Sequence, residues 1–177
     1  MHNAITLVLN EFFRICLLQK CPQDLPASPV LFWPVLFSYG AISAILLLPT
    51  QSLYFAVLTG FIEAIMLLLI TFVFLYLRSV PRRWLQTSTA LAGTGLIFSL
   101  IAVPLFYWRV FFEISTEIQT MIGLLVLVLV IWNVAVMTHI LRHALSASYM
   151  LGILGSVTYI TLTSLVLQIV LPVEGGM

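Results

Sequence analysis

Long apolar stretches separated by short polar breaks dominate the chain. A helix that crosses a bilayer needs about 20 mostly apolar residues. Stretches of this length predict five transmembrane helices, over residues 30–48, 53–77, 85–107, 119–141 and 149–171. Because the breaks between them are short, successive helices are expected to pack antiparallel.

The first twenty residues follow a different pattern. Asn3, Asn10, Glu11 and Arg14 lie mostly away from an apolar stripe with helical spacing. The stripe consists of Ile5, Leu9, Phe12, Phe13, Cys16 and Leu17. This pattern predicts an amphipathic helix over residues 3–18 that lies in the membrane interface. The prolines of "KCPQDLPASP" cannot continue that helix.

The composition agrees with a membrane location. Of the 177 residues, 62% are hydrophobic and 7% are charged, and the mean hydropathy is +1.18. Soluble domains carry about 25% charged residues. We therefore expect an all-α polytopic membrane protein that forms one membrane domain over residues 1–177. A net charge of +1 without a clustered basic face argues against nucleic-acid binding.

The positive charges indicate an orientation, because Lys and Arg collect in cytoplasmic loops. With the N-terminus inside, Arg109 is the basic residue that falls outside. The others fall on the cytoplasmic side: Arg14, Lys20, Arg78, Arg82, Arg83 and Arg142. We predict a multi-pass protein of the inner (plasma) membrane with a cytoplasmic N-terminus and an external C-terminus.

Glu63 is the first candidate for function. It lies in "LTGFIEAIMLLLI", about 15 Å from the start of its span and therefore near the midplane. A charged side chain there costs about 2.5–3.5 kcal/mol or more. The carboxyl is either a proton or cation site, a contact that holds a partner, or a neutral group hydrogen-bonded to a neighbouring helix.

Asn133 is the other deep polar residue, and helix geometry allows a hydrogen bond between it and Glu63. Small residues four apart allow membrane helices to approach closely. Such pairs are Gly60 and Ala64, Thr89 and Gly93, and Gly152 and Ser156. Since Gly60 and Ala64 flank Glu63, we expect Glu63 to face protein rather than lipid.

His139, Arg142 and His143 share one face at the inner end of the fourth span. Two histidines four apart can bind a metal, but their loop offers no acid or cysteine to complete a tetrahedral site. We therefore expect no metal or other cofactor. The three residues are instead expected to join Arg78, Arg82 and Arg83 in a basic rim that meets lipid headgroups.

Neither the cysteines nor any motif predicts catalysis. Cys16 and Cys21 are five apart, which matches neither a CxxC redox pair nor a zinc-binding pattern. GxSxG and HExxH are absent, and no pair of aspartates falls on facing spans. We expect a protein that is not an enzyme.

Two segments carry a resemblance to a known family. They are "FFRICLLQKCPQDLPASP" and "PRRWLQTSTALAGTGLIFSLIAVPL". Together with five spans and short loops, they resemble bacterial members of the Yip family, which are small five-span membrane proteins, and uncharacterised inner-membrane proteins of proteobacteria. Where eukaryotic Yip proteins carry a "DLYGP"-type signature, this chain has "QDLPASP". The resemblance implies no catalytic residue.

These patterns favour a non-enzymatic scaffold, assembly or membrane-organisation subunit that acts through helix contacts. Its expected partners are the lipid bilayer and a second copy or another membrane protein. The alternative is a small proton- or cation-coupled transporter or channel that works as an oligomer and uses Glu63. A third interpretation, lipid modification or movement, rests on the basic rim.

Overall fold

The computed structural model describes residues 2–112 and 115–170, with the side chains of the first helix described from Thr6 onward. Within these ranges the chain forms helices and no strands. The elements are α1 (His2–Cys16), η1 (Pro22–Asp24), α2 (Pro29–Leu47), α3 (Leu53–Leu77), η2 (Pro81–Arg83), α4 (Trp84–Phe111), α5 (Thr116–Ala144) and α6 (Tyr149–Val170).

The helices α2 to α6 are long and apolar enough to cross a membrane. The predicted all-α polytopic fold, with five spans and an N-terminal helix, is thus confirmed. α4 and α5 extend beyond the predicted spans, to Phe111 and over Thr116–Ala144, because helical hydrogen bonds continue past the apolar stretch that hydropathy detects. The predicted end of the last span, residue 171, lies outside the described residues.

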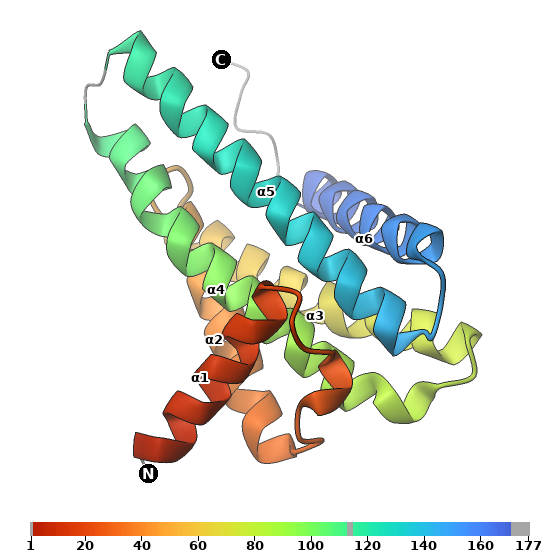
Figure 1. The fold of residues 1–177 in the computed structure, drawn as a ribbon. Coiled ribbons are helices and arrows are strands. Elements are labelled where there is room, and N and C mark those ends of the chain that lie inside the picture. The colour runs from red at the N-terminus through yellow and green to blue at the C-terminus, as the bar shows by residue number, and fades with distance from the viewer. Residues whose placement is uncertain (1, 113–114, 171–177) are drawn as a thin grey trace.

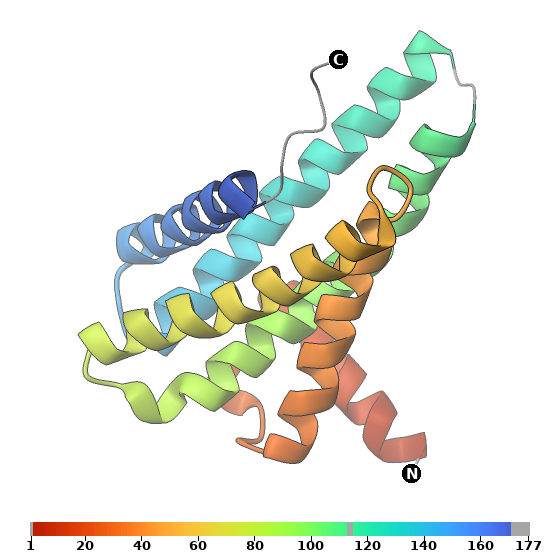
Figure 2. The same cartoon turned by 180° about the vertical axis from the view of Figure 1, so that it is seen from behind.

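The bundle has two parts. In the first part, α2 packs closely against both α3 and α4. In the second, α5 and α6 form a hairpin, with α5 packed against α4 and α6 against α3. Figure 1 shows α4 and α5 side by side, with α6 on the far side of α5. Figure 2, seen from the opposite side, shows α3 crossing α2. α4 is the central helix, and its residues 87–94 are all buried.

α1 lies obliquely across the bundle in Figure 1, against α4 and α5. Phe12 and Cys16 of its apolar stripe are buried against the bundle, whereas Phe13 and Leu17 are exposed. The Trp132 indole Nε1 donates a hydrogen bond of 2.9 Å to the Cys16 carbonyl. Part of the stripe therefore packs against the bundle while the rest is exposed, and a hydrogen bond attaches the end of α1 to α5.

We call the end of the bundle that carries η1, η2 and the α5–α6 turn the basal end. Two residues at this end have a left-handed backbone, Ser79 after α3 and Ser146 after α5, with φ of 58° and 48°. Leu18, just after α1, has the same conformation with φ of 61°. Each follows a helix end and allows a backbone hydrogen bond back to that helix, such as Val80 N–H to the Leu75 carbonyl at 2.9 Å.

Candidate functional site

The polar centre of the bundle is built on the crossing of α2 and α3. A Cβ atom added to Gly60 would collide with the Gly40 carbonyl oxygen and lie 3.2 Å from the Ala44 nitrogen. Both obstacles are backbone atoms, so this approach requires glycine. A Cβ on Gly40 would lie 3.8 Å from the Ala64 Cβ. Gly60 and Ala64 thus both face α2.

This close approach brings Glu63 of α3 to Ser43 of α2. Glu63 is partly buried and Ser43 is buried. The Ser43 hydroxyl is the hydrogen-bonding neighbour of the Glu63 carboxyl. The close approach of the two helices therefore gives the partly buried carboxyl a protein hydroxyl as its neighbour.

The polar contacts continue from Ser43 into α6. Ser43 also contacts the Tyr39 side chain one turn earlier on α2, and Tyr39 contacts Tyr159 of α6. Tyr159 is itself buried. These contacts link α3, α2 and α6 through side chains, and we call Glu63, Ser43, Tyr39 and Tyr159 the core cluster.

A cavity borders the core cluster at the junction of the two parts of the bundle. Its volume is about 110 Å³, and its polar lining residues are Tyr39, Thr94, Asn133 and Tyr159. The Thr94 hydroxyl donates to the Ala90 carbonyl of its own helix at 2.8 Å. Leu67, Leu91, Met137 and Ile160 also line the cavity, and a partly polar cavity of this size has room for water.

Asn133 lies on the α5 side of the cavity. Within the described part of the chain, the hydrogen-bonding neighbour of Glu63 is Ser43 and not Asn133, which sequence geometry had allowed. A similar predicted depth did not bring Glu63 and Asn133 into hydrogen-bonding contact, because the two residues belong to different parts of the bundle. Asn133 also lines a hollow of about 270 Å³ between α4, α5 and α6.

The second pair of small residues, Thr89 and Gly93 of α4, makes different contacts. A Cβ on Gly93 would collide with the Phe12 ring of α1, while the Thr89 hydroxyl donates to the Leu85 carbonyl at 2.6 Å.

The third pair joins α6 to α5. A Cβ on Gly152 would lie 2.8 Å from the Thr138 carbonyl oxygen. The Ser156 hydroxyl shares a 3.1 Å hydrogen bond with the Thr138 hydroxyl. The four-residue spacing of Gly152 and Ser156 therefore correctly predicted a close helix contact here.

Four of the six residues of the predicted basic rim lie together around the C-terminal end of α5: Arg83, His139, Arg142 and His143. Arg83 donates to the Ala144 carbonyl at 3.0 Å and to the Ser146 hydroxyl at 2.8 Å, so it satisfies the C-terminal end of α5. The Arg142 guanidinium lies 4.4 Å from the centre of the Tyr149 ring. Arg78 and Arg82 are exposed.

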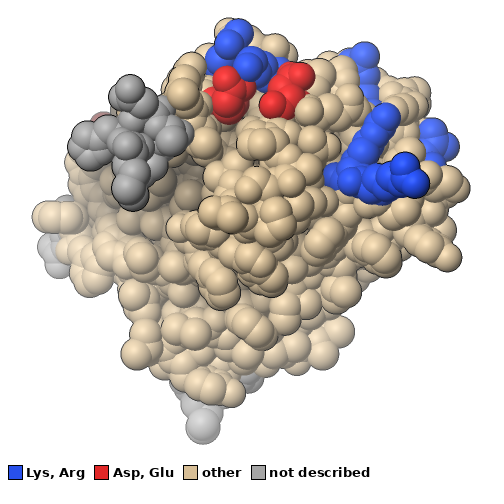
Figure 3. Space-filling model, turned by 90° about the horizontal axis from the view of Figure 1, so that it is seen from below, with Lys and Arg blue, Asp and Glu red and all other residues tan. Residues whose placement is uncertain are grey.

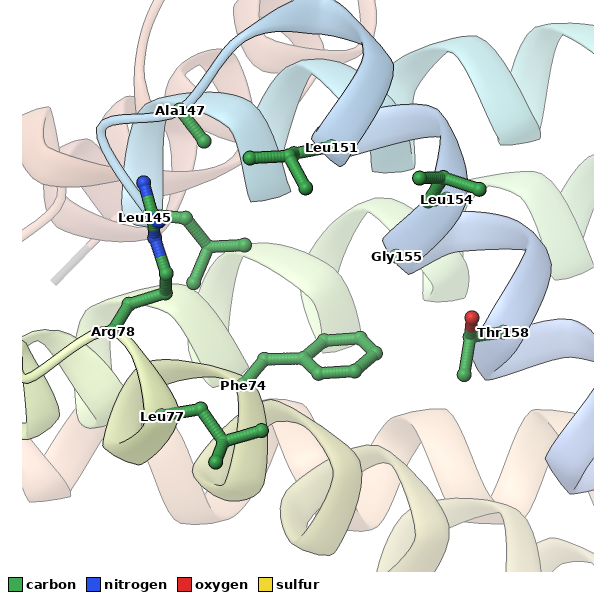
Figure 4. Close-up of a pocket in the computed structure, with 9 residues that line it drawn as sticks. All are labelled: Phe74, Leu77, Arg78, Leu145, Ala147, Leu151, Leu154, Gly155 and Thr158. Carbon is green, nitrogen blue, oxygen red and sulfur yellow. The ribbon is translucent and has the colours of Figure 1, made fainter.

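Figure 3 shows Lys and Arg side chains at separate places along the margin of the face seen from below, beside a broad surface of other residues. Arg78 borders an apolar groove of about 210 Å³ between α3 and α6. In Figure 4 the Phe74 ring extends into this groove, with Leu151 and Leu154 across from it. An arginine beside an apolar groove suits a lipid with an anionic headgroup.

His139 and His143 lie one turn apart, with ring centres 4.5 Å from each other. Cys21, from the loop before η1, lies beside both. Burial raises the pKa of the Cys21 thiol, the Asp24 carboxylate raises it further, and Arg142 opposes these effects. The third residue of this group comes from a segment that no local spacing rule connects to α5.

Sequence reasoning missed Tyr39, Ser43 and Tyr159 as members of the polar centre. Tyr39 and Ser43 are four apart on α2 and flank Gly40, which is a pattern that could have marked a polar, close-packed face. Tyr159 carries no such signal, because only the tertiary fold brings it to Tyr39.

The fold and this polar centre define a polytopic α-helical membrane protein. No family model matches the chain, and no curated protein and no solved structure matches it either.

Proposed function

We propose that the protein is a non-enzymatic assembly or membrane-organisation subunit of the inner (plasma) membrane, with its N-terminal segment in the cytoplasm. In this proposal it acts through helix contacts, and α5 is the helix that binds a partner. The observation that carries the proposal is the exposed outer face of α5, which is the least buried of the membrane-spanning helices.

This face of α5 has a regular pattern. Residues at alternating spacings of three and four are all exposed, and we call them the α5 seam: Met121, Leu124, Val128, Ile131 and Ala135. Alternating spacings of three and four are the pattern by which two helices interlock in a coiled coil. Many membrane helices pair with the same geometry.

The partner that fits the α5 seam is a second copy of the chain. Two copies inserted the same way present parallel α5 helices, which can pair along identical seams about a twofold axis. Ala135 at the basal end of the seam allows the two backbones to approach closely.

Cysteine crosslinking tests this pairing. Val128→Cys is introduced into a chain whose native cysteines are changed to serine, and the protein is oxidised in native membranes. We expect a disulfide-linked dimer at Val128→Cys and none at Phe61→Cys, a control on α3 that is similarly exposed. Light scattering in lipid nanodiscs that gives only monomer, together with no crosslink at Val128→Cys, would overturn the proposal.

A second function has an observation of its own. The core cluster leads from Glu63 to a partly polar cavity, and ionisable residues inside a membrane often mark proton or cation pathways. This arrangement supports the alternative of a proton- or cation-coupled transporter.

Reconstituted vesicles separate the two functions. Proton or sodium flux that depends on the protein and is lost in Glu63→Gln, while the variant elutes and unfolds like the wild type, would favour transport. Equal ion permeability of protein-containing and empty vesicles would argue against it. Glu117→Gln, an exposed carboxyl in the first turn of α5, is the matched control.

A further inference from the structure

Three side chains of types that can bind a metal come together at the basal end from two distant segments. The Cys21 sulfur and one nitrogen each of His139 and His143 lie within 4.8 Å of one another. His139 is buried, and the other two side chains are partly buried. The sequence of α5 contains two of these residues, His139 and His143, but no third ligand. The fold brings the third, Cys21, from the loop before η1.

The surroundings of His139 orient its ring. Its Nε2 lies 3.1 Å from the Lys20 carbonyl oxygen. Because a carbonyl only accepts hydrogen bonds, this contact makes Nε2 the donor, and in the tautomer with its proton on Nε2 the ring can bind a metal through Nδ1. Histidines that bind metals commonly donate their other N–H to a backbone carbonyl in this way.

Hydrogen bonds hold the Cys21 loop against α5. The Gln23 side chain donates to the His143 carbonyl at 2.9 Å. Within the loop itself, the Cys21 backbone N–H donates to the Asp24 carboxylate at 2.9 Å. Because Trp132 also donates to the Cys16 carbonyl, the loop is attached to α5 on both sides of Cys21.

The ligand set selects a class of ion. One thiolate and two imidazoles suit a borderline or soft cation, and Zn²⁺ binds such sets with four ligands in a tetrahedron. Zinc bonds of about 2.0–2.3 Å place tetrahedral ligand atoms about 3.3–3.6 Å apart. The observed spread of up to 4.8 Å therefore needs a contraction of about 1 Å.

The charges near the site are of both signs. Arg142 is an electrostatic neighbour of Cys21 and His143 and opposes a cation, although its guanidinium also lies over the Tyr149 ring. Arg83 adds a second positive charge, with its guanidinium 3.4 Å from the His143 carbonyl oxygen. The Asp24 carboxylate is an electrostatic neighbour of both Cys21 and His143. Water can supply the fourth ligand, because the Asp24 carboxylate lies outside the group and accepts the Cys21 backbone N–H.

We propose that Cys21, His139 and His143 form a zinc site that fastens the proline-rich loop to the basal end of α5. This replaces the expectation of no metal, which rested on the ligands of one loop. The site is independent of the pairing proposed for α5.

Metal binding to the full chain tests the proposal. The protein is purified in detergent through a histidine-free tag, stripped with chelator and supplied with Zn²⁺ or Co²⁺. We expect about one zinc per chain after gel filtration. We also expect the charge-transfer absorption of a cobalt–thiolate bond and the visible bands of tetrahedral cobalt.

Variants assign the ligands. Cys21→Ser should remove the thiolate absorption and weaken zinc binding by more than about 100-fold, beyond the loss typical of outer partners. His143→Gln should also weaken binding. Cys16→Ser, the matched control, should keep the absorption. Zinc should raise the unfolding temperature of the wild type and not that of Cys21→Ser.

Three results would overturn the zinc site. They are no zinc retained by the wild-type protein, equal zinc affinity in Cys21→Ser, and cobalt absorption without a thiolate component. Elution and unfolding temperature without metal show whether each variant is folded. Because Cys21 and His143 are only partly buried, at least one of their variants is expected to fold.

Discussion

The core cluster and the basal cluster of Cys21, His139 and His143 both gather polar side chains from distant segments, but by different means. In the core cluster, the glycine contact between α2 and α3 brings Ser43 to Glu63. At the basal end, backbone carbonyls of the Cys21 loop and of α5 accept the hydrogen bonds that hold the cluster.

The difference follows from the two environments. Within a membrane helix the backbone groups are already paired, so side chains meet only where helices approach closely. Loops at the membrane surface have free backbone groups that can fix a neighbouring side chain. The core cluster should therefore depend on small residues, and the basal cluster on loop hydrogen bonds.

Gly60→Leu should have the largest effect. Its side chain has no space at the α2–α3 crossing, because the obstacles are backbone atoms of Gly40 and Ala44. We expect a loss of more than about 3 kcal/mol in the free energy of unfolding. Unfolding of the variant in detergent, followed by near-ultraviolet circular dichroism, measures it.

Gly123→Leu is the matched control. A Cβ atom at Gly123 of α5 meets nothing within 4 Å, so this change should be neutral or slightly stabilising. Equal stability of Gly60→Leu and the wild type would show that the crossing does not hold the core cluster together.

The two cysteines should differ about 100-fold in labelling rate by maleimide at pH 8. Cys16 is 3% exposed. Burial raises its pKa to about 11, which leaves about one thiol in a thousand ionised at this pH. Burial also raises the pKa of Cys21, but its side chain is only partly buried.

Mass spectrometry of the labelled peptides measures both rates. Denaturant should abolish the difference, because both thiols then return to the ordinary pKa. Faster labelling of Cys16 in the folded protein would mean that α1 does not pack against the bundle as described.

Ser43→Ala should cost about 1–2 kcal/mol, because it leaves the partly buried Glu63 carboxyl without its hydroxyl neighbour. Ser88→Ala is the control. Ser88 is fully buried, and its hydroxyl has no hydrogen-bond partner among the described residues. Its removal should be neutral or stabilising. Thermal unfolding of both variants compares them, and an equal loss would contradict the role of Ser43.

The fold could be predicted from sequence because hydrocarbon imposes the length and apolar character of each span. Glu63 could also be identified from the sequence, since a carboxyl in an apolar stretch stands out. Its partners could not be predicted, because hydropathy indicates the depth of a residue in the membrane but not which helix lies against each face. Cys21 and His139 are far apart in sequence, and no spacing rule connects a loop to a helix so distant from it.

Ser79→Gly should have the smallest effect and concerns the basal turns. Ser79 has a left-handed backbone with φ of 58°, which glycine adopts without strain. We expect a gain of about 0.5–1 kcal/mol, measured by thermal unfolding. Ser146→Gly relieves similar strain at φ 48° but removes the hydroxyl that accepts from Arg83 at 2.8 Å. Its gain should therefore be smaller than that of Ser79→Gly, and an equal gain would mean that the Arg83 contact with Ser146 contributes nothing to the stability of the basal end.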